Sequence, residues 1–353
     1  MSPLLRCAIA ATLTAAALSG AASTAHATDV RPDPQAIVAA APMRGVALGL
    51  HFQQPSRTYE SLLWEIAASG AGWVSLVVSW SQRDVRAVAV APRSGESPPD
   101  ADVVRAVASA HALGLKVMIF PIVALEQRAQ GEWRGRLAPT EPSAWFESYG
   151  RFVAHYADLS SRTGVAAICV GSELGSMQGF TSNWQELIRD VRSRFGGLVT
   201  YSANWDNYRS VAFWPDVDLI GVTAYHELSR SPDVTPEVAQ LVATWRPIVS
   251  DLRALSQQWA RPVLITEAGY VSQTAAARFP WDYTRTEPVD LAAQLRLYDA
   301  FREAWSAVPE LGGVFIWNWF GEGGARDNGY SPRGKPAEGT VRQWFGGEPT
   351  VAR

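Results

Sequence analysis

Short apolar runs alternate with segments of helical periodicity along most of this chain, and this alternation limits the folds open to it. Eight runs of strand length recur between residues 45 and 319. Several are apolar at consecutive positions, which is typical of parallel strands covered on both faces. Eight such strand–helix units favour an α/β fold, a closed (β/α)8 TIM barrel in one domain, over an open doubly wound sheet.

The boundaries of these elements follow from the same patterns. We expect strands at 45–50, 73–78, 115–123, 165–170, 198–203, 217–224, 263–266 and 313–319. We expect helices at 58–69, 99–113, 143–162, 183–194, 236–258, 289–306 and 337–345. The segment 205–215 after the fifth strand has room for a single helical turn. Long loops follow strands two, three, seven and eight, and in a barrel they form the catalytic face.

The first 27 residues have the pattern of a targeting segment rather than of a folded element. An arginine near the start precedes an Ala- and Leu-rich stretch, and Ala25-His26-Ala27 is an A-x-A cleavage site. We expect a signal peptide removed after Ala27, hence a secreted or periplasmic protein, although an uncleaved anchor is the alternative. Residues 28–42 are Pro/Ala-rich and predict a linker, which leaves 43–348 as the barrel domain. No other segment is long and apolar enough for a membrane span.

Composition argues against a nucleic-acid partner and is compatible with a carbohydrate ligand. The formal net charge is −3 without a Lys/Arg block, so a nucleic-acid partner is not expected. Cleavage would leave Cys169 as the only cysteine, and no intrachain disulfide could then form. The 15 tryptophans suit a sugar-binding cleft, because indole faces stack on pyranose rings, but core packing explains such a number equally well. We expect a monomer without cofactor.

Two glutamates stand where apolar strands end, and they are the principal candidates for chemistry. The run 165–172 leads directly into Glu173, and the run 262–266 leads into Glu267. Carboxylates at the C-terminal ends of two barrel strands are suited to glycoside hydrolysis. We assign Glu173 as general acid and then base, and Glu267 as nucleophile. The alternative for Glu173 is a carboxylate that only stabilises a helix N-terminus.

Other strand ends supply candidate substrate contacts. In chain order, these are His51, Trp80, Asn204, Trp205, Tyr225, Trp281 and Trp317. Tyr225 could donate its hydroxyl to Glu267, or be an ordinary aromatic residue at the rim. Trp317 and Trp319 are two residues apart, so both are expected on the same side of the eighth strand. No metal-ligand spacing and no Gly-x-Ser-x-Gly elbow is found.

Several of these segments, in order and spacing, resemble glycoside hydrolases of clan A, and within them family 113, known for β-1,4-mannanase activity. They are LKVM (115–118), WRG (133–135), GSEL (171–174), YSANW (201–205), DLIGVTAY (218–225), TEAGY (266–270), GVFIWNW (313–319) and GKPA (334–337). The resemblance spans about residues 45–344. Two positions depart from the relatives: Ser172 stands where most of clan A has asparagine, and the third strand carries apolar residues at 120–123 instead of Lys and His.

Together with the N-terminal leader, the resemblance implies a secreted retaining β-glycosidase that acts by double displacement. It implies Glu173 as acid/base and Glu267 as nucleophile, with Tyr225, Asn204, Trp205 and Trp317 in the cleft. The implied substrate is β-1,4-mannan or manno-oligosaccharides, attacked within the chain. A glycosidase or transglycosylase acting on another β-glycan, and a carbohydrate-binding barrel without turnover, remain the alternatives.

Overall fold

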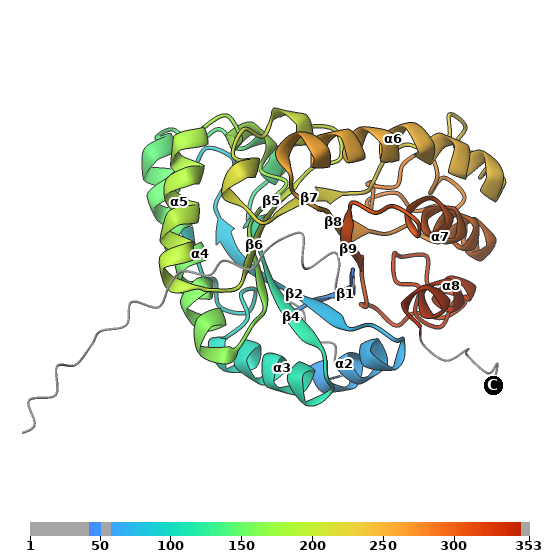
Figure 1. Cartoon of the computed structure of the whole chain (residues 1–353), viewed down its shortest axis with the longest axis horizontal. Helices are drawn as coiled ribbons and strands as arrows, with labels where there is room; N and C mark the ends of the chain where they lie inside the picture. The colour runs from blue at the N-terminus through green and yellow to red at the C-terminus, as the bar shows by residue number, and fades with distance from the viewer. Residues whose placement is uncertain (1–41, 51–57, 347–353) are drawn as a thin grey trace, which may run out of the picture. The chain divides into compact units, whose positions relative to one another are not determined.

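The computed structural model describes residues 42–50 and 58–346. Within them, eight parallel strands follow one another around a sheet that closes on itself, because β1 pairs with both β9 and β2 (Figure 1). The barrel strands are β1 (Met43–Gly49), β2 (Trp73–Gln82), β4 (Lys116–Leu125), β5 (Ala167–Ser172), β6 (Leu198–Ala203), β7 (Leu219–Thr223), β8 (Val263–Ala268) and β9 (Leu311–Ile316). A two-residue strand, β3 (Val90–Ala91), pairs antiparallel with the end of β2. The predicted (β/α)8 barrel is confirmed.

Helices connect the strands and surround the barrel (Figure 1). They are α2 (Tyr59–Ala68), α3 (Asp100–Ala112), α4 (Pro142–Thr163), α5 (Thr181–Arg194), α6 (Val238–Trp259), α7 (Leu291–Trp305) and α8 (Pro336–Phe345). After β6 there are two single 3-10 turns, η3 (Tyr208–Ser210) and η4 (Trp214–Asp216), as the short segment at this place predicted. Two more such turns, η1 (Arg134–Arg136) and η2 (Gly175–Met177), follow β4 and β5.

Apolar side chains fill two layers, one inside the barrel and one between strands and helices. The inner layer consists of Met43, Ala47, Val77, Met118, Phe120, Ala167, Cys169, Leu198, Leu219, Leu264 and Phe315. The outer layer is larger, and its fully buried tryptophans are Trp145, Trp184, Trp214, Trp245, Trp305 and Trp319. Core packing therefore accounts for a large part of the tryptophan content. Residues 120–123 belong to β4, and relatives were expected to carry polar groups there. The first of these residues, Phe120, packs in the inner layer.

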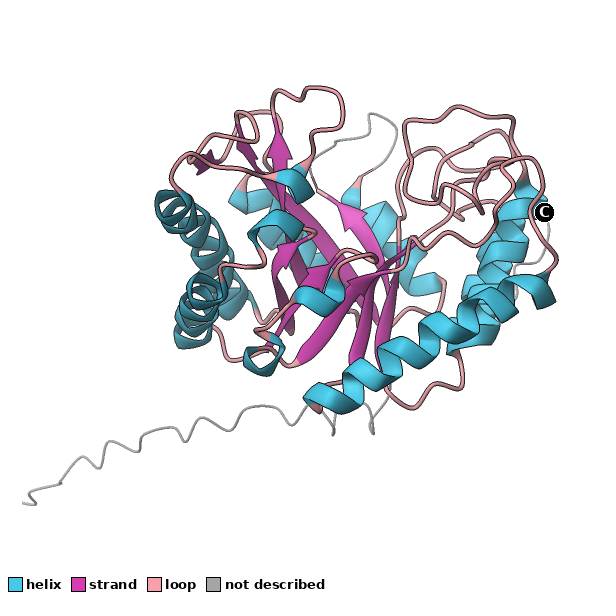
Figure 2. Ribbon diagram, turned by 90° about the horizontal axis from the view of Figure 1, so that it is seen from above, coloured by secondary structure: helices cyan, strands magenta, loops and turns pink. Residues whose placement is uncertain are grey.

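The long loops lie at the ends toward which the strands point. They follow β2, β4, β8 and β9, as predicted from the sequence, and also β7, where residues 224–237 lead to α6. Figure 2 shows these loops beyond the arrowheads of the strands, while the helices flank the barrel. In a barrel of this type the active site is built at this face.

Candidate active site

Glu173 and Glu267 both stand at the loop-bearing mouth of the barrel. β5 ends at Ser172, and the next residue, Glu173, donates its backbone N–H to the Ser202 carbonyl oxygen (2.8 Å). Its φ is +56°, a left-handed conformation uncommon for a residue with a side chain, which often marks functional positions. Glu267 is the next-to-last residue of β8, and its carbonyl oxygen accepts from the Ala224 N–H (2.8 Å). Glu173 is 7% exposed and Glu267 3%.

Each glutamate has a different partner. The Tyr225 hydroxyl donates to Glu267 Oε2 (2.9 Å), which is the hydrogen bond expected from the sequence. The Arg134 guanidinium, from η1, donates through Nη2 to Glu173 Oε2 (2.5 Å). Both members of this ion pair are shielded from solvent, with side chains 24% and 9% exposed. Glu173 is therefore in direct contact with a cation, whereas the hydrogen bond to Glu267 comes from a neutral hydroxyl.

Burial, and secondly the negative charge of Glu173, raise the pKa of Glu267 to about 8. The Arg134 charge and the hydroxyls of Tyr225 and Ser172 act in the opposite direction and do not offset these effects. When two carboxylates share a site, they titrate as a pair. In the protein without substrate, the site therefore disfavours the ionised form of Glu267.

The raised pKa of Glu267 predicts a pH dependence of stability. The unfolded chain loses this proton near pH 4.5, whereas the native state keeps it until about pH 8. The contribution of Glu267 to the free energy of unfolding is thus fully present below pH 4.5 and declines as pH rises toward 8, by on the order of a few kcal/mol. Urea unfolding followed by tryptophan fluorescence should show wild type losing stability relative to Glu267→Gln between pH 5 and 8. Parallel pH dependences would contradict the raised pKa.

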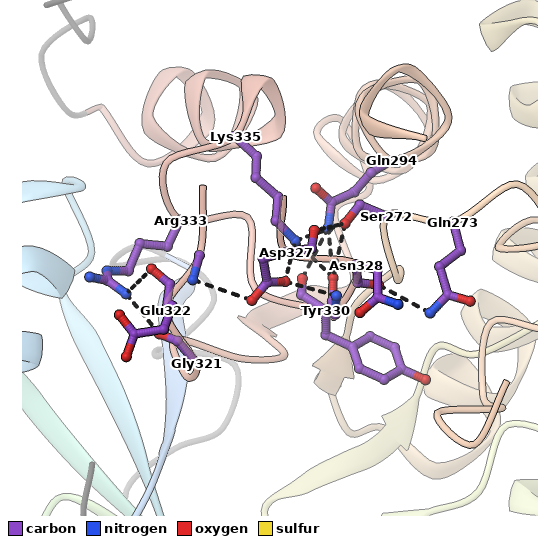
Figure 3. A network of polar contacts seen from close by, with 12 residues as sticks. Ser272, Gln273, Gln294, Gly321, Glu322, Asp327, Asn328, Tyr330, Arg333 and Lys335 are labelled. Carbon is purple, nitrogen blue, oxygen red and sulfur yellow. Dashed lines mark hydrogen bonds and ion pairs between the residues drawn. The ribbon is translucent and has the colours of Figure 1, made fainter. Parts of the chain in front are cut away.

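A buried lysine holds together two of the loops at the mouth. Lys335 Nζ donates to Asp327 Oδ1 (2.8 Å), to Ser272 Oγ (2.8 Å) and to the Gly329 carbonyl oxygen (2.9 Å), as Figure 3 shows in part. The Lys335 side chain is fully buried, and burial lowers its pKa while Asp327 counteracts the shift. Because these partners come from the loops after β8 and β9, the lysine fixes one loop against the other.

These two loops bring Tyr330 beside the catalytic candidates. Gln294 of α7 donates to the Tyr330 carbonyl oxygen (3.2 Å), and the Tyr330 hydroxyl donates to the Pro280 carbonyl oxygen (2.6 Å). The Tyr330 ring meets the Tyr225 ring edge-on, with centroids 6.0 Å apart. Burial, followed by the charge of Glu267, raises the pKa of Tyr330 far above its usual range. Tyr330 therefore supports the tyrosine that contacts Glu267.

Four other predicted residues gather at the mouth. Trp205 and Trp281 stack, with ring centroids 5.3 Å apart and planes inclined by 27°. Asn204 is occupied within the protein, because its amide donates to Asp206 Oδ1 (2.7 Å). Trp317 is half-buried and packs against the inner layer of the barrel. The exposed Trp281, paired with Trp205, presents an aromatic surface suited to a sugar ring.

Trp80 does not flank this site, contrary to the prediction. β2 continues to Gln82 rather than ending near Val78, so Trp80 remains within the strand and shares the outward face of Val78. Its ring stacks on Phe152 of α4, with centroids 5.0 Å apart. His51 lies outside the described residues, as do residues 1–27 and nearly all of 28–42.

The expected common orientation of Trp317 and Trp319 is also wrong. β9 ends at Ile316, so the alternation of a strand does not extend over both residues. Trp317 packs on the inner layer, whereas Trp319 is buried in the outer layer and donates through Nε1 to Glu65 Oε2 (3.0 Å). One of the two, Trp317, is therefore available to the site.

Sequence reasoning gave no role to Arg134 or Tyr330. Arg134 belongs to one of the segments that carry the family resemblance, but one arginine in a long loop does not indicate which carboxylate it will contact. Tyr330 follows the last strand by 14 residues, and only tertiary structure brings it to Tyr225. Gly269, two residues after Glu267, can be explained from its residue type. A Cβ at this position would lie 2.2 Å from the Trp317 carbonyl oxygen, so only glycine lets the two backbone segments lie this close together.

The described residues contain no group of three or more His, Cys, Asp or Glu side chains placed to hold a metal ion. Within the same part of the chain, no helix combines the length and apolar character that a membrane span requires.

A family model and several solved structures show the family to which the chain is similar. The model of Glycoside Hydrolase Family 113 matches residues 51–335. A family 113 β-mannanase from Alicyclobacillus acidocaldarius, solved in complex with ManMIm, is 30% identical, with 86% of this chain and 97% of that chain covered and a TM-score of 0.77. A second family 113 β-1,4-mannanase, at 22% identity, covers 87% of this chain and 99% of its own with the same TM-score, which supports the fold. Among curated proteins, none matches the sequence.

Proposed function

Because the chain belongs to glycoside hydrolase family 113, we propose that this glycoside hydrolase is a secreted, retaining β-mannanase that cleaves β-1,4-mannan or manno-oligosaccharides within the chain. The observation that carries the proposal is the pair Glu173 and Glu267 at the ends of β5 and β8, close enough for the charge of one to raise the pKa of the other. The substrate class is supported by the activity that the similar solved structures are named for.

In the proposed mechanism, Glu173 gives its proton to the oxygen that leaves with the aglycone, while a carboxylate oxygen of Glu267 attacks the anomeric carbon. The carbon–oxygen bond to the aglycone breaks as the bond to Glu267 forms. Water then attacks the same carbon, Glu173 accepts its proton, and Glu267 is released as a carboxylate. Two inversions at one carbon give net retention.

Tyr225 and the stacked tryptophans have supporting roles in this proposal. The Tyr225 hydroxyl donates to Oε2 of Glu267, and the Ser172 hydroxyl, next to Glu173, also acts on the Glu267 carboxyl. Glu267 is thus oriented by neutral hydroxyl groups of the protein. Trp205 and Trp281 provide a platform at the rim on which a mannose unit would stack.

The test is product release from β-mannan, glucomannan, β-glucan and xylan by the chain from residue 28 onward. We expect manno-oligosaccharides of mixed length from the first two substrates, a rapid fall in viscosity, and β-anomeric products in early NMR spectra. Release of mannose alone would contradict internal cleavage, and α-anomeric products would contradict retention. Binding without release would favour a carbohydrate-binding barrel, and cleavage of β-glucan alone would favour another substrate class.

Secretion is tested separately, by expressing the full-length chain and determining by N-terminal sequencing whether the exported protein is cleaved after Ala27.

A further inference from the structure

Two loops from opposite sides of the barrel contact each other across its mouth. The Arg128 guanidinium, in the loop after β4, donates through Nη1 to the Tyr283 hydroxyl oxygen (2.9 Å), in the loop after β8. Counted from β1 around the closed barrel, β4 is the third strand and β8 the seventh, so these two strands lie opposite each other. The hydrogen bond therefore spans the face at which the active site of such a barrel is built.

The tip of the β8 loop also contacts the far side of the strand that leads into Glu173. Trp281, two residues before Tyr283, stacks on Trp205, which follows the end of β6. In the sheet, β5 lies between β4 and β6. Because the tip contacts residues that follow both of these neighbours, residues 281–283 pass over the end of β5. This is the side on which the leaving group of the proposed reaction would lie, since Glu173 protonates it.

The base of the β8 loop is held firmly, whereas its tip is exposed. Gln273 and Val289 form an antiparallel bridge at the base. Gln273 Nε2 also donates to the Asn328 carbonyl oxygen (3.2 Å), as Figure 3 shows. At the tip, Tyr283 is 62% exposed, and its partner Arg128 is exposed as well. Exposed contacts open more easily than buried ones, so this bond can break while the base of the loop stays in place.

The backbone on both sides of Arg128 is fixed by hydrogen bonds. The Gln127 N–H donates to the Arg83 carbonyl oxygen (2.8 Å), which continues the contact of β4 with β2 past the ends of both strands. The Ala129 N–H donates to Glu132 Oε2 (2.9 Å). The arginine between them is therefore presented to the opposite loop from a defined position.

We propose that Arg128 and Tyr283 are specificity-determining residues, whose hydrogen bond forms a strap across the mouth and favours manno-oligosaccharides over the interior of long mannan chains. This inference rests on the proposed function and specifies which mannans the site accepts most readily. A short oligosaccharide can enter by its end beneath the strap. A long chain continues on both sides of the bond to be cleaved, so it enters sideways, and the strap must open first.

The test compares Tyr283→Phe and Arg128→Met, each of which removes one partner of the strap, with Arg136→Met, which removes an exposed arginine from the same loop. In the first two variants we expect kcat/KM on long soluble mannan to rise about three- to tenfold, the factor that one net hydrogen bond corresponds to. On mannopentaose kcat/KM should stay close to the wild-type value. The double variant should equal either single one, because both changes remove the same contact. Arg136→Met should behave as wild type.

A permanent strap should have the opposite effect. Cysteines introduced by Arg128→Cys and Tyr283→Cys can be joined by a bismaleimide in the chain from residue 28 onward. The native Cys169 should not react, because it is buried and burial raises the pKa of its thiol to about 12. The cross-linked protein should lose most of its cleavage of long mannan and keep its hydrolysis of a dinitrophenyl β-mannobioside. Each single-cysteine variant treated with the same reagent is the control.

An unchanged ratio of kcat/KM between long mannan and mannopentaose would overturn the proposal, and so would unimpeded cleavage of long mannan by the cross-linked protein. A protein that cleaves no glycan would refute the proposed function instead. The strap is then tested by the rate of binding, followed by tryptophan fluorescence. Tyr283→Phe should bind long mannan faster than wild type and bind mannopentaose at the same rate. Equal rates of binding to long mannan would overturn the strap as well.

Discussion

Replacing Glu267 by alanine should lower kcat on β-mannan by roughly 10⁴- to 10⁶-fold, because the variant cannot form the covalent bond on which double displacement depends. The fold should persist, since the substitution removes a buried carboxyl group whose ionisation opposes stability above about pH 5. The measurement is initial release of reducing ends from mannan, with the far-ultraviolet circular dichroism spectrum as a check on folding.

A matched control for Glu267→Ala is Glu126→Ala, which removes a carboxylate just after β4 that contacts neither catalytic candidate. Glu126→Ala should keep nearly full activity. Azide added to Glu267→Ala should restore turnover of an activated aryl β-mannoside and give the α-mannosyl azide, since a small anion then takes the place of the carboxylate. Full mannan activity in Glu267→Ala, or a β-azide product, would contradict Glu267 as nucleophile.

Glu173→Ala should lose activity in proportion to how poor the leaving group is. On mannan, where the departing oxygen needs a proton, we expect a loss of about 10²- to 10⁴-fold in kcat/KM. On a dinitrophenyl β-mannoside, whose leaving group needs no proton, kcat/KM should fall far less, and the glycosyl-enzyme should accumulate because no base activates the water.

The measurement for Glu173→Ala is the ratio of kcat/KM between these two substrates, set beside that of wild type. Azide should speed turnover of the dinitrophenyl substrate and give the β-azide, because attack on the glycosyl-enzyme needs no base. Equal losses on both substrates would argue against an acid role. Such a result would leave Glu173 as a carboxylate that only shapes the strand end.

The barrel could be predicted from the sequence because its evidence is local and repeated. Strands buried on both faces require continuous apolar runs, and each run leaves this pattern regardless of what it pairs with. Glu173 and Glu267 were found for the same reason, since each directly follows such a run. The Tyr225 hydrogen bond to Glu267 also followed, because adjacent parallel strands end at the same face.

Contacts made between loops could not be predicted in this way. Which carboxylate Arg134 contacts depends on how η1 packs against the end of β5. The hydrophobic periodicity of the sequence does not predict this packing. The position of Tyr330 depends on the hydrogen bonds of Lys335 across two loops. Trp80 was misplaced because β2 runs four residues beyond its predicted end, which kept that ring on the outward face of the strand.

The small number of lysines in the barrel gives the protein one accessible lysine for covalent coupling to a support or dye. Lys116 and Lys335 are the only lysines in the sequence, and Lys335 is enclosed by its partners. Lys116 is exposed and begins β4, at the end of the barrel opposite the loops. Apart from the α-amino group, an amine-reactive resin or dye would therefore couple at Lys116. The immobilised enzyme would be anchored by the base of the barrel, with its mouth turned toward the dissolved polysaccharide.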